Sequence, residues 1–235
     1  MNWSLHLGLV VILAISGMVP CDAAVSIRPS TCPTIVVETG SGSSEDRRLV
    51  CDGAAKARAF FQSHGIDLKQ PVRIRLHQAG IENHVAHIGL YDANKDQIDL
   101  LTFDQARRQT VRNSLFGMRM NESLYVSVVA HEVAHAIVEQ NMAVQPASVI
   151  GQEYIAYVVQ LATMESRTRS AILERYDLAA YADIEEMSST FYALNPSGFG
   201  IKVFRHYQSL SDPGSFIRGL LSGDIQPAGS EADWW

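Results

Sequence analysis

Residues 34–48 have little regular hydrophobic pattern, and a helical pattern follows them. Residues 39–48 are rich in Gly, Ser and charged side chains, which predicts a flexible loop, and residues 34–37 before them are apolar enough for a short strand. Apolar residues then recur at helical spacing over residues 52–64, with Asp52 as the expected N-cap and Gly65 as the expected stop. The first long element is therefore predicted to be a helix.

Three short strands are predicted after this helix. Residues 71–78 alternate between apolar and polar side chains, as in a strand with one buried face. Residues 86–91 and 97–102 are two shorter runs separated by a polar segment, which favours a hairpin. The patterns after residue 104 are helical, so strands and helices are segregated along the chain. The predicted class is α+β, with a small three-stranded sheet and a mostly helical C-terminal half.

The first residues form an apolar run of another kind. Residues 7–19 are apolar but shorter than the roughly 20 residues that a membrane-spanning helix needs. Pro20 and a small-residue segment follow, as in a secretory signal peptide, so residues 1–24 are predicted to be cleaved. Cleavage implies an exported protein, periplasmic or extracellular, without a stable membrane span. An uncleaved membrane anchor is the alternative interpretation.

Composition limits the class of protein. The 235 residues are 47% hydrophobic with a net charge of −6, which suits one folded domain, predicted over residues 25–221. Residues 222–235 are rich in Gly, Pro and acidic residues and are predicted to be a disordered tail. The 19 Lys+Arg against 25 Asp+Glu disfavour a nucleic-acid partner, because such proteins carry a basic excess.

The predicted cleavage changes the number of cysteines in the mature protein. The chain has 3 Cys, and removal of residues 1–24 takes away Cys21. Cys32 and Cys51 remain, and an even count in an exported protein favours one disulfide between them.

The candidate chemistry lies in a strongly apolar segment that contains His131-Glu132-x-x-His135. On a helix, residues four positions apart differ by about 40° in direction and about 6 Å along the axis, so both imidazoles can bind one ion. Glu132 is offset to the adjoining edge, where its carboxylate can reach a metal-bound water. Burying these three polar groups in an apolar helix is costly unless something binds them.

The His-Glu-x-x-His motif resembles the zincin metallopeptidases. Within them, the gluzincins take a third metal ligand from a Glu on a following helix, and Glu153, in a helix predicted over residues 148–163, occupies the corresponding place. The resemblance implies a zincin-like (minigluzincin-like) domain that binds one Zn²⁺ through His131, His135 and Glu153. It also implies hydrolysis of a peptide or protein substrate, with Glu132 as general base on a zinc-bound water.

Two features leave parts of this site open. Asp183, Glu185 and Glu186 are rival third ligands, each at a poorer separation from the His pair. Many gluzincins also have an Asp four residues after the ligand Glu, which holds the first His through its other ring nitrogen. This chain has Tyr157 there, so the partner of His131 must come from elsewhere.

A peptidase also needs an oxyanion donor and a surface for its substrate. The donor candidates are His206 and Tyr207, in a helix predicted to begin after Asn195-Pro196-Ser197, with Tyr157 as a third. By analogy with small gluzincins, residues 98–102 or 86–91 would form the sheet edge along which a peptide binds as an added strand.

Two other classes of function compete with the peptidase. One is a catalytically inactive, zinc-stabilised binding domain of the same fold. The absence of an Asp at position 157 to hold His131 favours this alternative. The other is a metal-free structural protein, which requires the His pair and Glu153 to occur together by coincidence.

Overall fold

The computed structural model describes residues 32, 35–37, 42–81, 87–111, 114–143 and 148–227. The predicted signal peptide, residues 1–24, and residues 228–235 of the predicted tail lie outside this part. Residues 222–227 lie inside it, and the Ile225 amide donates to the Gly219 carbonyl at 3.0 Å. None of the described helices has the length and apolar character needed to cross a membrane.

The strands form one mixed sheet with the order β1-β2-β4-β3. β2 (Val72–His77) and β4 (Gln97–Leu101) are parallel neighbours, and β3 (Gly89–Asp92) pairs antiparallel with β4. The three predicted strands are thus present, and β1 (Ile35–Val37) adds a fourth on the outer side of β2. β1 and β3 are the edge strands of this sheet, whereas β4 lies inside it, so of the two segments predicted to form the substrate-binding edge only β3 is at an edge.

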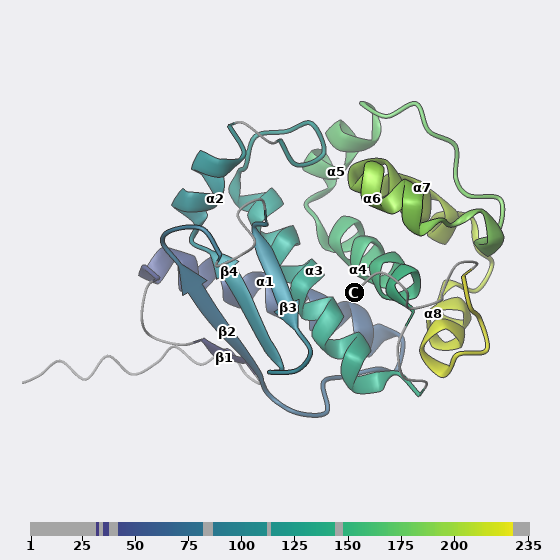
Figure 1. The fold of residues 1–235 in the computed structure, drawn as a ribbon, viewed down its shortest axis with the longest axis horizontal. Helices are drawn as coiled ribbons and strands as arrows, with labels where there is room; N and C mark the ends of the chain where they lie inside the picture. Colours follow the sequence, from purple (N-terminus) through teal and green to yellow (C-terminus); the bar gives the residue numbers. More distant parts are fainter. Residues whose placement is uncertain are drawn as a thin grey trace, which may run out of the picture.

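Helices make up most of the rest of the described chain, which confirms the α+β class and the helical C-terminal half. The sheet lies at one end of the molecule and α6, α7 and α8 lie at the other, with α3 and α4 between them (Figure 1). The helices are α1 (Ser44–Ser63), α2 (Phe103–Gln109), α3 (Glu122–Asn141), α4 (Val149–Thr163), α5 (Ser166–Leu173), the 3-10 helix η1 (Ile184–Glu186), α6 (Ser189–Leu194), α7 (Pro196–Ser209) and α8 (Pro213–Ser222).

The start of α1 corrects the predicted loop at residues 39–48, because the helix begins at Ser44. Ser43 and Asp46 form a capping box, in which the Asp46 amide donates to Ser43 Oγ (3.1 Å) and the Ser43 amide donates to Asp46 Oδ2 (2.8 Å). Asp46 also accepts from the Phe103 amide at 2.7 Å, which ties α1 to the start of α2. A tertiary contact thus stabilises the capping box of α1, which the Gly/Ser-rich composition of the segment did not indicate.

The predicted N-cap Asp52 is consequently wrong, since it lies inside α1 and pairs with Lys56 at 3.0 Å. The predicted stop is confirmed: Gly65, just after the C-cap, has φ +74°, which glycine adopts without steric cost. The predicted disulfide is present as well. Cys32 and Cys51 are joined across a Cα–Cα distance of 5.4 Å, which ties the N-terminal segment to α1.

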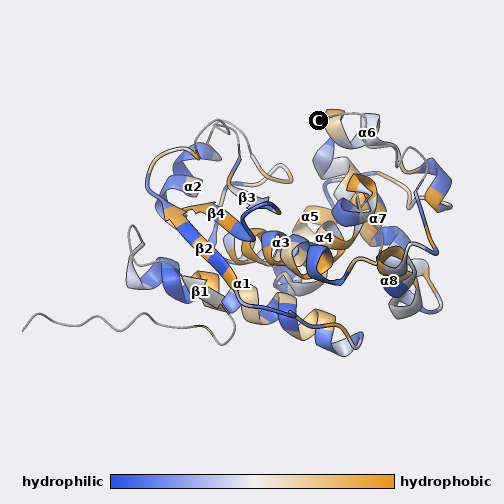
Figure 2. Ribbon diagram, turned by 60° about the horizontal axis from the view of Figure 1, so that its bottom comes forward, coloured by the Kyte–Doolittle hydropathy of each residue, from blue (hydrophilic) through white to orange (hydrophobic). Residues whose placement is uncertain are grey.

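α3 is the central helix and packs against α1, α4 and the edge of the sheet. It is apolar on almost every side, as expected for a helix whose middle is buried, and with α4 it forms a largely orange centre in Figure 2. Gly53 of α1 permits a close approach, because a Cβ there would lie 2.6 Å from the Val126 carbonyl oxygen. The consequence is a closely packed helix pair, of which α3 carries the His-Glu-x-x-His motif.

Candidate metal centre

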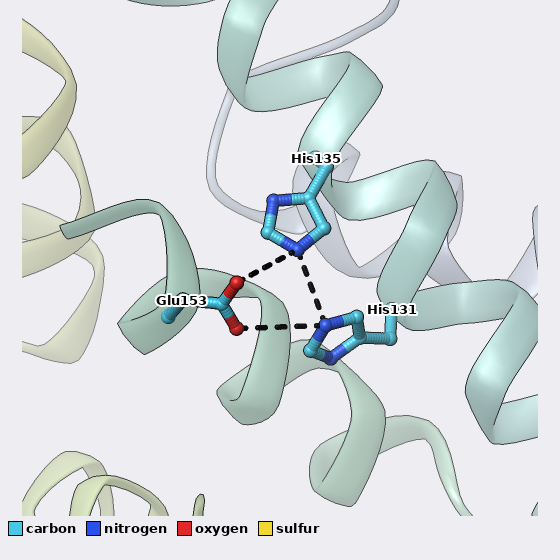
Figure 3. A group of neighbouring side chains, drawn as sticks. All are labelled: His131, His135 and Glu153. Carbon is cyan, nitrogen blue, oxygen red and sulfur yellow. Dashed lines mark hydrogen bonds and ion pairs between the residues drawn. The ribbon is translucent and has the colours of Figure 1, made fainter. Parts of the chain in front are cut away.

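The structure brings His131, His135 and Glu153 together. The two histidines point from one side of α3 toward α4, and Glu153 points back from α4 (Figure 3). The Nε2 atoms of the histidines are 3.1 Å apart. Glu153 Oε2 lies 3.7 Å from His131 Nε2, and Glu153 Oε1 lies 3.6 Å from His135 Nε2. Within the described residues, this is the one cluster of His, Cys, Asp and Glu side chains with the spacing of a metal site.

These separations fit one small cation. Ligands at about 2.0 Å from a tetrahedral ion lie about 3.3 Å from one another, close to the three measured distances. The cluster also holds buried polar atoms without hydrogen-bond partners, namely His131 Nδ1 and Glu153 Oε2. A buried carboxylate oxygen without a partner is costly, and coordination of an ion would satisfy it. The residues present therefore suit a metal ion.

Local signals position the two helices that carry the cluster. α3 starts where the Asn121 side chain accepts from the Leu124 amide at 2.8 Å, and α4 starts where Ser148 caps the Gly151 amide at 3.3 Å. At the other end of α4, the Arg169 guanidinium donates to the carbonyls of the final turn, including that of Leu161 at 3.2 Å. The start of α3 and both ends of α4 are thus fixed by side-chain hydrogen bonds.

Glu132 lies deeper than the three clustered residues and is 8% exposed. Burial, followed by the charge of Glu153, raises its pKa to about 8. The Tyr91 backbone N–H, from edge strand β3, donates toward the carboxylate and lowers the pKa in opposition. The raised pKa means that the ionised form of Glu132 is unfavourable in these surroundings. A cation bound nearby would therefore stabilise the carboxylate.

His131 is enclosed by α4. Burial, and then the neighbouring His135, hold its pKa well below the usual range, so the imidazole is neutral and able to ligate a metal. The Tyr157 ring packs edge-on against it, with centroids 4.8 Å apart. The Gln160 side chain and the Ala156 carbonyl act in the opposite direction on the His131 pKa. Residues of α4 thus surround His131 without the Asp that gluzincins place at position 157.

Two tyrosines accompany Glu153. Burial raises the pKa of both Tyr157 and Tyr192, and the Glu153 charge raises each further. The Tyr192 hydroxyl in turn favours the charged form of Glu153. Tyr192 was not among the residues expected from the sequence. It lies on the six-residue helix α6, and no local pattern indicates that α6 packs beside Glu153.

The structure does not bring His206 and Tyr207 into this cluster. His206 Nδ1 is hydrogen-bonded to the Tyr154 hydroxyl at 2.8 Å, and Tyr154 projects from another side of α4 than Glu153. The Tyr207 hydroxyl lies 3.2 Å from His64 Nε2, at the end of α1. The position of α7 gives both side chains partners away from the cluster. Neither is therefore placed to donate to an oxyanion.

The rival third ligands also lie elsewhere. Asp183 caps η1 by accepting from the backbone amides of Glu185 and Glu186, at 2.8 and 3.2 Å. All three side chains are exposed, and they are not part of the half-buried cluster. Glu153 is the acidic residue that the fold brings to the His pair.

The raised pKa of Glu132 predicts a pH-dependent stability in the metal-free protein. Folding raises this pKa from 4.5 to about 8, so the folded state holds the proton more tightly, and stability falls as pH rises through this range. Between pH 7 and 8 the free energy of unfolding should fall by about 1 kcal/mol. Urea denaturation in the presence of a chelator measures it. Glu132→Gln should have a flatter profile, and an equally steep one would contradict the assignment.

An α+β fold with a half-buried cluster of two histidines and one glutamate, beside a second, buried carboxylate, defines the protein as a candidate metalloprotein. The chain belongs to a family of unknown function, DUF6639, whose model matches residues 36–229. The match includes the whole candidate metal centre. Comparison with curated proteins and with solved structures finds no match.

Proposed function

We propose that the protein is an exported zinc metallopeptidase with a zincin-like (minigluzincin-like) fold. The observation that carries this proposal is the convergence of His131, His135 and Glu153 at distances that suit one ion, with Glu132 adjacent. Two His and one Glu are a ligand set of catalytic zinc sites, which keep a fourth position for water. The order of elements supports the fold: a small sheet, a helix with the two histidines, then a helix with the glutamate.

Each residue of the site would have a distinct role. A bound zinc ion supplies Lewis acidity and lowers the pKa of a coordinated water to about 7. Glu132 would take the proton of the attacking water and pass it to the leaving amine. Tyr157, whose ring packs against His131, and Tyr192, whose ring packs against Tyr157, would be the candidate oxyanion donors. Edge strand β3 would bind the peptide as an added strand.

Export is proposed from the N-terminal sequence and the disulfide. Residues 1–24 have the composition of a signal peptide, and the Cys32–Cys51 bridge suits an oxidising compartment such as the periplasm or the extracellular space.

The proposal is tested by metal content and by peptide cleavage. The purified protein should contain one zinc ion per chain, and zinc added after chelation should raise its melting temperature. A broad peptide library, digested and analysed by mass spectrometry, should give cleavage products that a chelator abolishes. Absence of zinc, together with stability that does not respond to chelation, would refute the proposal.

Tyr157 favours a second candidate, a zinc-stabilised binding domain without turnover. Partners that hold a ligand His through its second nitrogen usually raise metal affinity and activity, and a phenol at this position cannot supply a carboxylate. This candidate predicts the same zinc content and the same stabilisation, but no cleavage of the peptide library. The digest therefore separates the two functions.

A further inference from the structure

Gly89 of edge strand β3 lies directly against the Glu132 side chain. A Cβ built at position 89 would lie 2.6 Å from Glu132 Cγ and 2.7 Å from Glu132 Oε1. These distances are far below van der Waals contact, and the third close atom belongs to Leu100, at 2.8 Å. Any residue other than glycine would therefore displace Glu132 or separate β3 from α3.

Tyr91, two residues along the same strand, also acts on the Glu132 carboxylate. Its backbone N–H favours the charged form and lowers the Glu132 pKa, in opposition to burial. Glu132 is buried and projects from α3, which packs against β3, so Gly89 of β3 provides the space that the carboxylate occupies.

A glycine inside a strand weakens the sheet, because it has no side chain to pack and loses more entropy on folding than other residues. Gly89 has a neighbour that explains this cost, namely a carboxylate that takes the space of its missing side chain. We propose that Gly89 is a positioning residue, which sets the place of the Glu132 carboxylate beside the metal centre. This inference rests on the proposed function of Glu132 as general base.

The first test is Gly89→Ala in the zinc-loaded, full-length protein. A displacement of the base by about 1 Å should lower kcat by about 10²-fold, while KM and the zinc Kd stay within about twofold. The matched control is Gly151→Ala, where a Cβ meets only ordinary contacts of 3.6 Å or more. An unchanged kcat in Gly89→Ala, or a change confined to KM, would overturn the proposal.

Removal of the Glu132 side chain provides the second test. Glu132→Ala removes Cγ and the carboxylate, the two groups that a Cβ at position 89 would meet at 2.6 and 2.7 Å. Adding Gly89→Ala to Glu132→Ala should therefore cost much less in the free energy of unfolding than Gly89→Ala costs in the wild type. Equal losses in both backgrounds would mean that Gly89 acts independently of Glu132. If Gly89→Ala alone fails to fold, folding of the double variant supports the contact, and failure of both overturns it.

A third measurement does not need turnover. Acetohydroxamate chelates zinc as its anion, and a carboxylate beside the metal accepts the proton that the hydroxyl loses on binding, so its affinity reports on the position of Glu132. Gly89→Ala should bind it about 10-fold or more weakly, at unchanged zinc content, and wild-type affinity would overturn the proposal. A protein that binds zinc without hydrolysing peptides would refute the peptidase, while this measurement would still decide the role of Gly89. A protein that binds no zinc would refute both.

Discussion

Glu132→Gln is expected to bind one zinc ion per chain and to hydrolyse peptides about 10²- to 10⁴-fold more slowly than the wild type. Gln has nearly the same shape as Glu, so the packing against Gly89 is preserved, but the amide cannot accept the proton of the attacking water. Glu132 also lies outside the three residues that converge on one point, so zinc should remain bound. The measurement is the initial rate on a peptide identified by the library digest.

Glu165→Gln is the matched control for this change. Glu165 is an exposed residue before α5 that makes no side-chain cap, and its variant should have wild-type activity. Zinc content is measured on the same samples, so that loss of metal is not mistaken for loss of the base. Wild-type hydrolysis by Glu132→Gln would exclude Glu132 as general base and leave the metal centre unaffected.

Loss of any one of the three clustered residues should abolish stabilisation by zinc. With free zinc at about 1,000 times the Kd, the wild type should gain about 4 kcal/mol in the free energy of unfolding, whereas His131→Ala, His135→Ala and Glu153→Gln should gain close to none. In the metal-free state Glu153→Gln should be at least as stable as the wild type, because burial of the Glu153 charge is unfavourable. Urea denaturation with zinc and with a chelator measures both quantities.

Glu185→Gln tests the alternative ligand directly. This side chain is exposed next to Asp183 on η1, and its replacement should leave zinc binding unchanged. Zinc stabilisation that survives in Glu153→Gln and disappears in Glu185→Gln would show that the third ligand comes from η1.

Much of the fold follows from local patterns. The alternation at residues 71–78 and the apolar run at residues 148–163 correspond to β2 and α4, because burial of one face is a local requirement. The start of α1 could not be obtained in this way. Its capping box occurs in a Gly/Ser-rich segment, and the Asp46 contact with Phe103, distant in sequence, supports it.

The candidate site also contains residues that the sequence indicates and residues that only the packing places. The spacing of His131 and His135 dictates a shared direction on any helix, and Glu153 is found through the resemblance to gluzincins. His206 and Tyr207 are suitable oxyanion donors by residue type alone, but the packing of α7 directs them toward Tyr154 and His64. Gly89 can be recognised from the sequence only in part. A glycine within a predicted strand indicates that another group approaches the backbone closely, but the sequence does not identify that group.

The sequence by itself determined the α+β class, the Cys pair and the alignment of two imidazoles on one helix face, because these depend on periodicity, composition and helix geometry. Only the tertiary structure decided that Glu153 faces that His pair and that Gly89 makes room for Glu132. Such contacts join residues that are distant along the chain. They depend on how helices and strands pack, which the spacing of residues within one element does not encode.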